Sequence, residues 1–229
     1  MILPEKILAH LFPLLTPSRQ ALLKRVLAQR TRYLTVVLEE AYQAHNAGAV
    51  VRSCEAFGLQ EVYVIDKYHR TESAWQLSRG AAKWVKMNVY EGGSEGRQRC
   101  WEALKQQGYQ VVVATPHQAQ KDLASFVPTQ RTAFWFGSEK KGISSDILQR
   151  ADGYLHIPIY GFVESFNVSV AVALVLQAMI GKIRVMSDCP WPLSQEEQMA
   201  LLLEWTEKSL PNGPKLRAYY EAQLLSEKL

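Results

Sequence analysis

The amino-acid sequence predicts an α/β protein built on a parallel β-sheet, and two observations lead to this prediction. Short apolar segments of strand length alternate with segments of helical length through the middle of the chain. Most of these short segments are apolar throughout rather than alternating, which is typical of parallel strands covered by helices on both faces. With 229 residues, 48% of them hydrophobic, the chain is long enough for one sizeable core with appendages rather than two full domains.

The expected strands lie at residues 34–38, 62–65, 85–90, 111–114 and 133–136. One helix is expected between the first two strands, ending at Gly58, because glycine is favoured just after a helix C-terminus. A second, polar helix is expected over residues 94–107. A short strand and turn at 157–161 then leads into an apolar helix at 168–180, whose composition predicts burial on most of its surface.

Helical segments flank this core. We expect a basic helical N-terminal arm at residues 1–33, a core at 34–181 and a helical tail at 182–229. Prolines divide the tail into two amphipathic helices, near 194–209 and 215–226.

The net charge of +4 is concentrated at the start of the chain. Residues 1–35 hold six basic residues against one acidic residue, whereas residues 36–180 hold fourteen of each. A basic helix can be a plain solvated face. The density of Arg25, Arg30 and Arg32 just before the first strand favours contacts to the phosphates of a nucleic acid.

Composition excludes several other classes. Three widely spaced cysteines, Cys54, Cys100 and Cys189, predict reduced thiols, and no cysteine or histidine spacing predicts a metal site. The apolar runs are shorter than the roughly 18–20 residues of a membrane span. Residues 1–6 lack the pattern of a signal peptide. We therefore expect a soluble cytoplasmic protein.

Polar residues cluster at the points where expected strands end and helices begin. Ser165, Asn167 and Ser169 stand at the start of the apolar helix, where backbone N–H groups lack helical partners. Ser165 or Asn167 alone could be a simple N-cap. Residues 137–143 repeat the arrangement after an earlier strand, and open α/β sheets build ligand sites at such strand ends.

A third cluster follows the first strand. Asn46 is expected to cap the helix there, and Arg52 lies under two turns further on. Taken alone, Asn46 would be a structural cap and Arg52 a surface or salt-bridge residue.

Together the three clusters carry a resemblance. They read Asn46-x-x-Ala49-x-x-Arg52, then Gly137-Ser138-Glu139-Lys140-x-Gly142-Ile143, then Ile157-Pro158-Ile159-x-Gly161-x-x-x-Ser165-x-Asn167-Val168-Ser169. In this order they resemble the three motifs of the SpoU/TrmH ribose methyltransferases over about residues 33–180. The branch of that family that acts on tRNA also has an N-terminal helical arm and C-terminal helices, as expected here.

The resemblance implies a SPOUT-type core with a deep trefoil knot and a homodimer packed through the knot region. It also implies S-adenosyl-L-methionine as the cofactor, held mainly by backbone groups. The matching positions are Thr115, Gly137, Ile157, Phe166 and Asn167.

The resemblance further assigns catalytic roles, with Arg52 as the catalytic arginine. An arginine side chain stays protonated at neutral pH, so we interpret Arg52 as an electrostatic clamp on the ribose 2′-oxygen and the adjacent phosphate. Asn46 would orient Arg52 or the ribose, and Ser165 and Asn167 would position the substrate. Glu139 would either fix the Arg52 guanidinium or act as the general base.

The substrate expected by analogy is the D-loop guanosine of tRNA, because residues 1–33 are too short for the extra RNA-binding domain of many ribosomal members. Alternatives are ribosomal RNA, an inactive knotted RNA-binding protein, and a methyltransferase acting on a base or a small molecule. The tail, with six basic and seven acidic residues, adds no support for tRNA.

Overall fold

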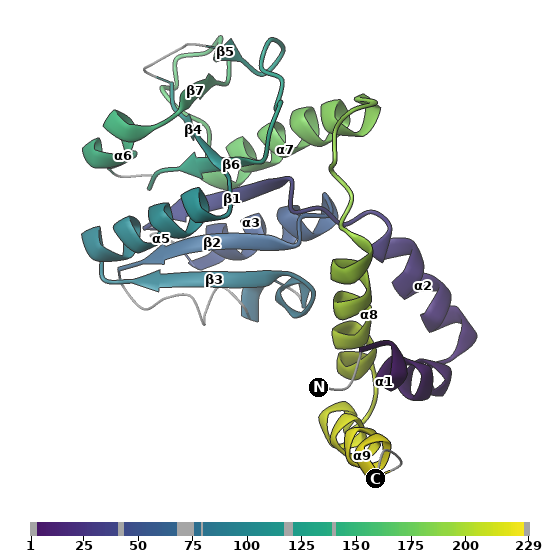
Figure 1. The fold of residues 1–229 in the computed structure, drawn as a ribbon. Helices are drawn as coiled ribbons and strands as arrows, with labels where there is room; N and C mark the ends of the chain where they lie inside the picture. Colours follow the sequence, from purple (N-terminus) through teal and green to yellow (C-terminus); the bar gives the residue numbers. More distant parts are fainter. Residues whose placement is uncertain are drawn as a thin grey trace. The chain divides into compact units, whose positions relative to one another are not determined.

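The computed structural model describes residues 4–40, 44–67, 76–78, 80–116, 121–138 and 141–226 (Figure 1). The chain divides into two compact units. Thr31–Trp191 forms the sheet unit, whereas Met1–Arg30 and Pro192–Leu229 together form the helical unit. The expected N-terminal arm and tail thus contribute to the same unit.

In the described part of the chain, the sheet unit contains seven strands in the order β3-β2-β1-β6-β4-β7-β5, and every pair of neighbours runs parallel. The strands are β1 (Leu34–Glu39), β2 (Glu61–Asp66), β3 (Lys86–Glu91), β4 (Gln110–Ala114), β5 (Lys121–Asp122), β6 (Thr132–Phe136) and β7 (Gly153–His156). The predicted parallel α/β class and the five predicted strands are confirmed.

The prediction of a strand at the start of residues 157–161 was wrong. The chain pairs earlier, through β7, and residues 157–160 have no regular structure. Pro158 has no amide hydrogen to give to a ladder, which explains why pairing stops before it. In β7 only Leu155 is buried, so this strand lacks the continuous buried pattern of β1, β2 and β6.

Helices cover both faces of the sheet (Figure 1). Val36 and Leu38 of β1 belong to the apolar cluster that includes α3 (Ala44–Ala56) and α7 (Val168–Val185). Val37, between them, belongs to the opposite cluster with α5 (Ser94–Gln106) and α6 (Ser145–Arg150). This split follows from the two-residue period of a strand.

Helix α3 begins earlier than expected. Ala44 and His45 precede Asn46 within the helix, so Asn46 lies in the first turn and is not the N-cap. The predicted C-terminal signal is confirmed, because Gly58 has a φ of 84° and its amide donates to the carbonyl oxygen of Glu55 at 3.0 Å.

Helix α7 is less buried than its composition predicted. Its buried residues are Val172, Val175, Leu176, Met179, Ile180 and Ile183, which form one stripe facing the sheet unit's core. Val170, Leu174 and Val185 are exposed. Among the described helices, α7 alone is long and apolar enough to span a membrane. This is weak evidence for a membrane-spanning helix, because a core helix of a soluble protein can have the same length and composition.

The helical unit consists of α1 (Pro4–Leu11), α2 (Pro17–Leu27), α8 (Gln195–Ser209) and α9 (Gly213–Ser226), with the short 3₁₀ turn Phe12–Leu14. Both helices expected in the tail are confirmed. Ser194 caps α8 in a capping box with Glu197. Ile7, Leu11 and Leu203 form the apolar centre of this unit.

The burial of the cysteines gives a first prediction. Cys54 and Cys100 are fully buried, and desolvation raises the pKa of both thiols. We expect neither to react with iodoacetamide at neutral pH in the folded protein, and both to react in denaturant. Mass spectrometry of labelled peptides measures this, and rapid native labelling of either residue would contradict the packing described for α3 or α5.

Candidate active site

The C-terminal edge of the parallel sheet gathers the positions expected to hold a cofactor. Strands β6, β4 and β7 are neighbours and run in the same direction, so their ends meet at one edge. Thr115 directly follows β4, Gly137 directly follows β6 and Ile157 directly follows β7. The amide of Thr115 donates to the carbonyl oxygen of Leu155 at 3.0 Å, which ties the first of these ends to the third strand.

Asn167 joins two of the three motifs. It is the N-cap of α7, and its Oδ1 accepts from the amide and the hydroxyl of Ser169 at 2.9 and 2.7 Å. Its Nδ2 donates to Oδ1 of Asn46 at 3.2 Å. Asn46 is only 3% exposed. The two asparagines, 121 residues apart, therefore lie in direct contact. Of the two candidate caps, Ser165 and Asn167, the N-cap is Asn167.

The second motif forms a loop closed by backbone hydrogen bonds. The amide of Ser138 donates to the carbonyl oxygen of Gly142 at 3.0 Å, and the amide of Gly142 donates back at 2.8 Å. A Cβ atom on Gly137 would lie 2.2 Å from the carbonyl carbon of Gly142, so only glycine fits there. Glu139, expected in catalysis, lies outside the described residues.

The remaining expected residues are accessible. Arg52 is exposed on α3, six residues after Asn46, which corresponds to a rise of about 9 Å along the helix axis. Ser165 and Phe166 are exposed in the segment just before α7. Asn46 is thus held inside the protein while Arg52 faces solvent.

Sequence reasoning missed Glu39 at the same edge. It ends β1, is 3% exposed, and accepts a hydrogen bond from Nε1 of Trp135 at 2.9 Å. A charged residue closing an otherwise apolar strand was the available signal.

One of the three arginines expected on RNA, Arg30, is buried. Arg30 is 1% exposed, and its guanidinium lies 5.1 Å from the ring centroid of Trp205 in the helical unit. A side chain buried this deeply is not available to a phosphate. Arg25 on α2 is exposed, as the prediction required.

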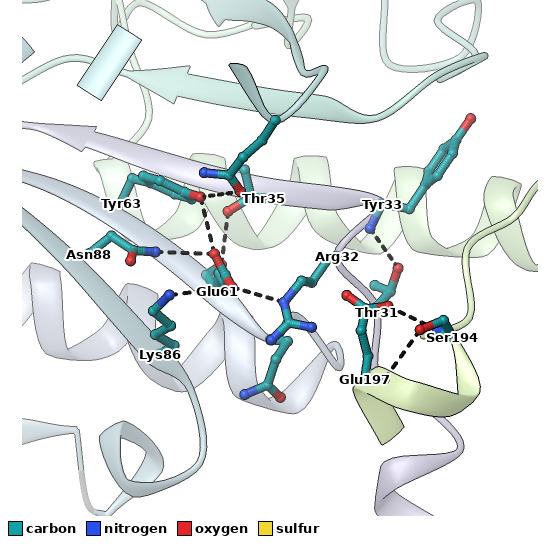
Figure 2. A network of polar contacts seen from close by, with 12 residues as sticks. Thr31, Arg32, Tyr33, Thr35, Glu61, Tyr63, Lys86, Asn88, Ser194 and Glu197 are labelled. Atoms are coloured by element: carbon teal, nitrogen blue, oxygen red, sulfur yellow. Dashed lines mark hydrogen bonds and ion pairs between the residues drawn. The ribbon is translucent and has the colours of Figure 1, made fainter. Parts of the chain in front are cut away.

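Arg32 is engaged at the opposite, N-terminal edge of the sheet (Figure 2). Its Nε lies 2.8 Å from Oε1 of the buried Glu61. Tyr63 and Asn88 also donate to that carboxylate, at 3.1 and 3.2 Å, and Lys86 lies 3.9 Å from it (Figure 2). Arg32 therefore neutralises a buried charge. Its side chain remains 24% exposed, so contact of Arg32 with RNA stays a prediction.

Comparison with known proteins identifies the family. Residues 33–177 match the model of the SpoU rRNA Methylase family. This chain belongs to the SpoU methylase family. The match covers the seven described strands and about the first half of α7, the region that contains all three motifs.

Similar proteins of other organisms are tRNA methyltransferases by name. The chain is similar to a tRNA (guanosine(18)-2'-O)-methyltransferase of Borreliella burgdorferi, with 33% identity over 86% of this chain and 88% of the relative. It is 32% identical to a protein of the same name from Thermus thermophilus, over 84% of this chain and 98% of the relative.

Solved structures give the same fold. The Aquifex aeolicus TrmH/SpoU tRNA modifying enzyme matches with a TM-score of 0.72 and 26% identity, covering 85% of this chain and 98% of that one. The SpoU methyltransferase AviRb from Streptomyces viridochromogenes, solved in complex with the cofactor AdoMet, matches with a TM-score of 0.58 and 23% identity over 70% of this chain and 62% of that one.

The chemistry of this edge fits S-adenosylmethionine. Ile157, directly after β7, and the exposed Phe166, before α7, are apolar residues of the kind that packs against an adenine ring. The loops after β4, β6 and β7 supply backbone donors and acceptors at neighbouring strand ends.

The two functions of the Asn167 side chain can be separated by substitution. Asn167→Ala removes both the cap and the donor to Asn46, and the lost cap alone should cost about 1 kcal/mol of unfolding free energy. Asn167→Ser keeps an oxygen for the Ser169 amide but loses the donor, so its stability should stay near wild type. Denaturant unfolding measures both variants, and equal stability of the two would remove the capping role.

Proposed function

We propose that this protein transfers a methyl group from S-adenosylmethionine to the ribose 2′-hydroxyl of a tRNA guanosine, the D-loop guanosine at position 18. The observation that carries the proposal is the hydrogen bond between Asn46 and Asn167, because it joins the substrate motif to the cofactor motif in one site. The names of the relatives support the substrate and the position.

In this proposal the cofactor lies at the C-terminal edge of the sheet, held by Thr115, Gly137, Ile157, Phe166 and Asn167. When bound, it supplies an electrophilic methyl group. The protein then has to align the 2′-oxygen with that methyl group and stabilise negative charge on the oxygen.

Arg52 is the residue proposed to stabilise that charge. Its exposure on α3 leaves the guanidinium accessible to a ribose and its phosphate. The planar guanidinium can donate to both at once, and because it stays protonated the proton leaves to a phosphate, to water or to Glu139.

The other residues position the reactants. Asn46 is fixed by Asn167 and orients Arg52 or the ribose, and Ser165 and Asn167 hold the substrate across the site. Glu139 of the second motif would either fix the Arg52 guanidinium or act as the general base.

A homodimer through the knot region forms part of the proposal. Val170 and Leu174 on α7, and Tyr160 and Phe162 in the segment before it, are exposed apolar residues. A second copy packed against them would remove this apolar surface from water. A trefoil knot in the sheet unit and a location in the cytoplasm complete the proposal.

Ribosomal RNA is the second candidate substrate, favoured by the description of the matching family model. The inactive RNA-binding protein and the methyltransferase of a base or small molecule remain weaker alternatives, because neither requires the Asn46–Asn167 arrangement.

A methylation assay tests the proposal. The protein is incubated with methyl-labelled S-adenosylmethionine and either unmodified tRNA transcripts or ribosomal RNA, and the products are digested to nucleosides. We expect labelled 2′-O-methylguanosine from tRNA, and none from a tRNA carrying 2′-deoxyguanosine at position 18. Label found only in ribosomal RNA would show that ribosomal RNA is the substrate instead of tRNA. No label in any RNA would overturn the proposed methyltransferase function.

The role of Arg52 gives the next prediction. Arg52→Ala should lower kcat at least about 100-fold, because it removes charge stabilisation of the reacting oxygen. Its affinity for S-adenosylmethionine, measured by calorimetry, should stay within a few-fold of wild type. Arg52→Lys should also fail, since an ammonium cannot donate to two groups in a fixed plane. Wild-type turnover of either variant would exclude Arg52 from the mechanism.

The basic arm can be tested with matched variants. Lys24→Gln with Arg25→Gln removes two exposed charges and should weaken tRNA binding and reduce the salt dependence by about one unit of slope per lost phosphate contact. Arg30→Gln changes a buried cation and should instead lower the unfolding temperature. If the affinity for tRNA and its salt dependence are unchanged in the double variant, the arm is only a solvated face that does not contact tRNA.

A further inference from the structure

The structure assigns Glu39 a positioning role: its buried carboxylate clamps the loop of the second motif, residues 137–144, in the conformation that the active site needs. This inference rests on the proposed function for its consequence in catalysis. It adds residues outside the three motifs, namely Glu39, Arg97 and Ser144, which we call the Glu39 clamp.

The carboxylate of Glu39 holds both ends of the loop. Oε2 accepts from Nε1 of Trp135 at 2.9 Å, on the strand that enters the loop. The same oxygen accepts from the amide of Ser144 at 3.3 Å, where the chain leaves the loop, and the hydroxyl of Ser144 donates to Oε1. One side chain on β1 therefore fixes the distance between the entry and the exit of the loop.

The loop itself is closed by its own backbone. The paired backbone hydrogen bonds between Ser138 and Gly142 form its neck, and the approach of Gly137 to Gly142 leaves no room for a side chain. Residues 139 and 140 lie beyond the neck in sequence. The base of the loop is therefore the part that Glu39 holds, on both sides of these two residues.

Charge explains why the clamp must stay intact. Glu39 is 3% exposed, and a buried carboxylate is costly unless it is paired and hydrogen-bonded. Arg97 of α5 supplies the pairing, with Nε 3.7 Å from Oε1 of Glu39. The same guanidinium lies 3.6 Å from Glu40 and 3.4 Å from Asp146, so it links β1, α5 and α6 beneath the loop.

Glu40 supplies a second, independent observation. It is a non-glycine residue with a φ of 48°, a conformation that costs free energy and persists only where the surroundings enforce it. In this conformation its carboxylate contacts Arg97 and lies 3.9 Å from Nζ of Lys141, within the loop. The strained backbone of Glu40 thus places its carboxylate between Arg97 and Lys141 of the loop.

Glu61 provides a matched control for the experiment. It is also a buried carboxylate paired with an arginine and a hydrogen-bonding aromatic residue, but it lies at the opposite edge of the same sheet (Figure 2). Glu39→Gln and Glu61→Gln remove the same charge with the same change of atoms. Ser144→Ala is a milder variant of the clamp that keeps the buried pair.

The test combines amide hydrogen exchange without ligand and steady-state methyl transfer. In Glu39→Gln and Ser144→Ala we expect faster exchange of residues 137–144 and a kcat reduced about 10- to 100-fold, with the KM for tRNA within a few-fold. Glu61→Gln should leave loop exchange unchanged and kcat within about twofold, even if its unfolding temperature falls equally.

The outcomes separate the inference from the proposed function. Unchanged loop exchange in both clamp variants, or a kcat for them matching that of Glu61→Gln, would overturn the positioning role. If Glu39→Gln does not fold, Ser144→Ala decides. If the wild-type protein transfers no methyl group, the proposed function fails, and the exchange comparison alone then decides whether the clamp holds the loop.

Discussion

The hydrogen bond from Asn167 to Asn46 is the contact on which the rest of the site depends. It connects the N-terminus of α7 with the first turn of α3 across 121 residues of sequence. Because Asn167 also caps α7, the same amide fixes where that helix starts and where the first motif lies. The exposed Arg52 is carried on the rigid continuation of α3, so its position follows from this bond and from helix geometry.

The parallel sheet separates stability from chemistry. Both of its edges bury a carboxylate, and the two are used differently. At the N-terminal edge Glu61 collects Arg32, Tyr63 and Asn88 (Figure 2), in a region that holds none of the family motifs. At the C-terminal edge Glu39 collects donors from the loop that carries the second motif. The same interaction serves packing at one end and, we infer, positioning at the other.

Much of the sheet unit could be predicted because β1, β2, β4 and β6 are largely apolar and buried. The strand β7 could not, since its pattern is mixed and the apolar residues Ile157 and Ile159 placed the expected strand several residues too late. The motif residues were found by their order along the chain, but their contact was not, because side-chain pairing between distant segments leaves no local pattern. The role of Arg30 was misassigned for the same reason: a cation buried beside Trp205 looks identical in sequence to one facing solvent.

The most direct test of one joined site is a double-mutant cycle between Asn46 and Asn167, read on kcat/KM for methyl transfer to tRNA. The variants are Asn46→Ala, Asn167→Ser and the double substitution. If the two amides act through their mutual hydrogen bond, the double variant should be no slower than the slower single one, with a coupling free energy of about 0.5–3 kcal/mol. Effects that simply multiply, giving no coupling, would contradict the account.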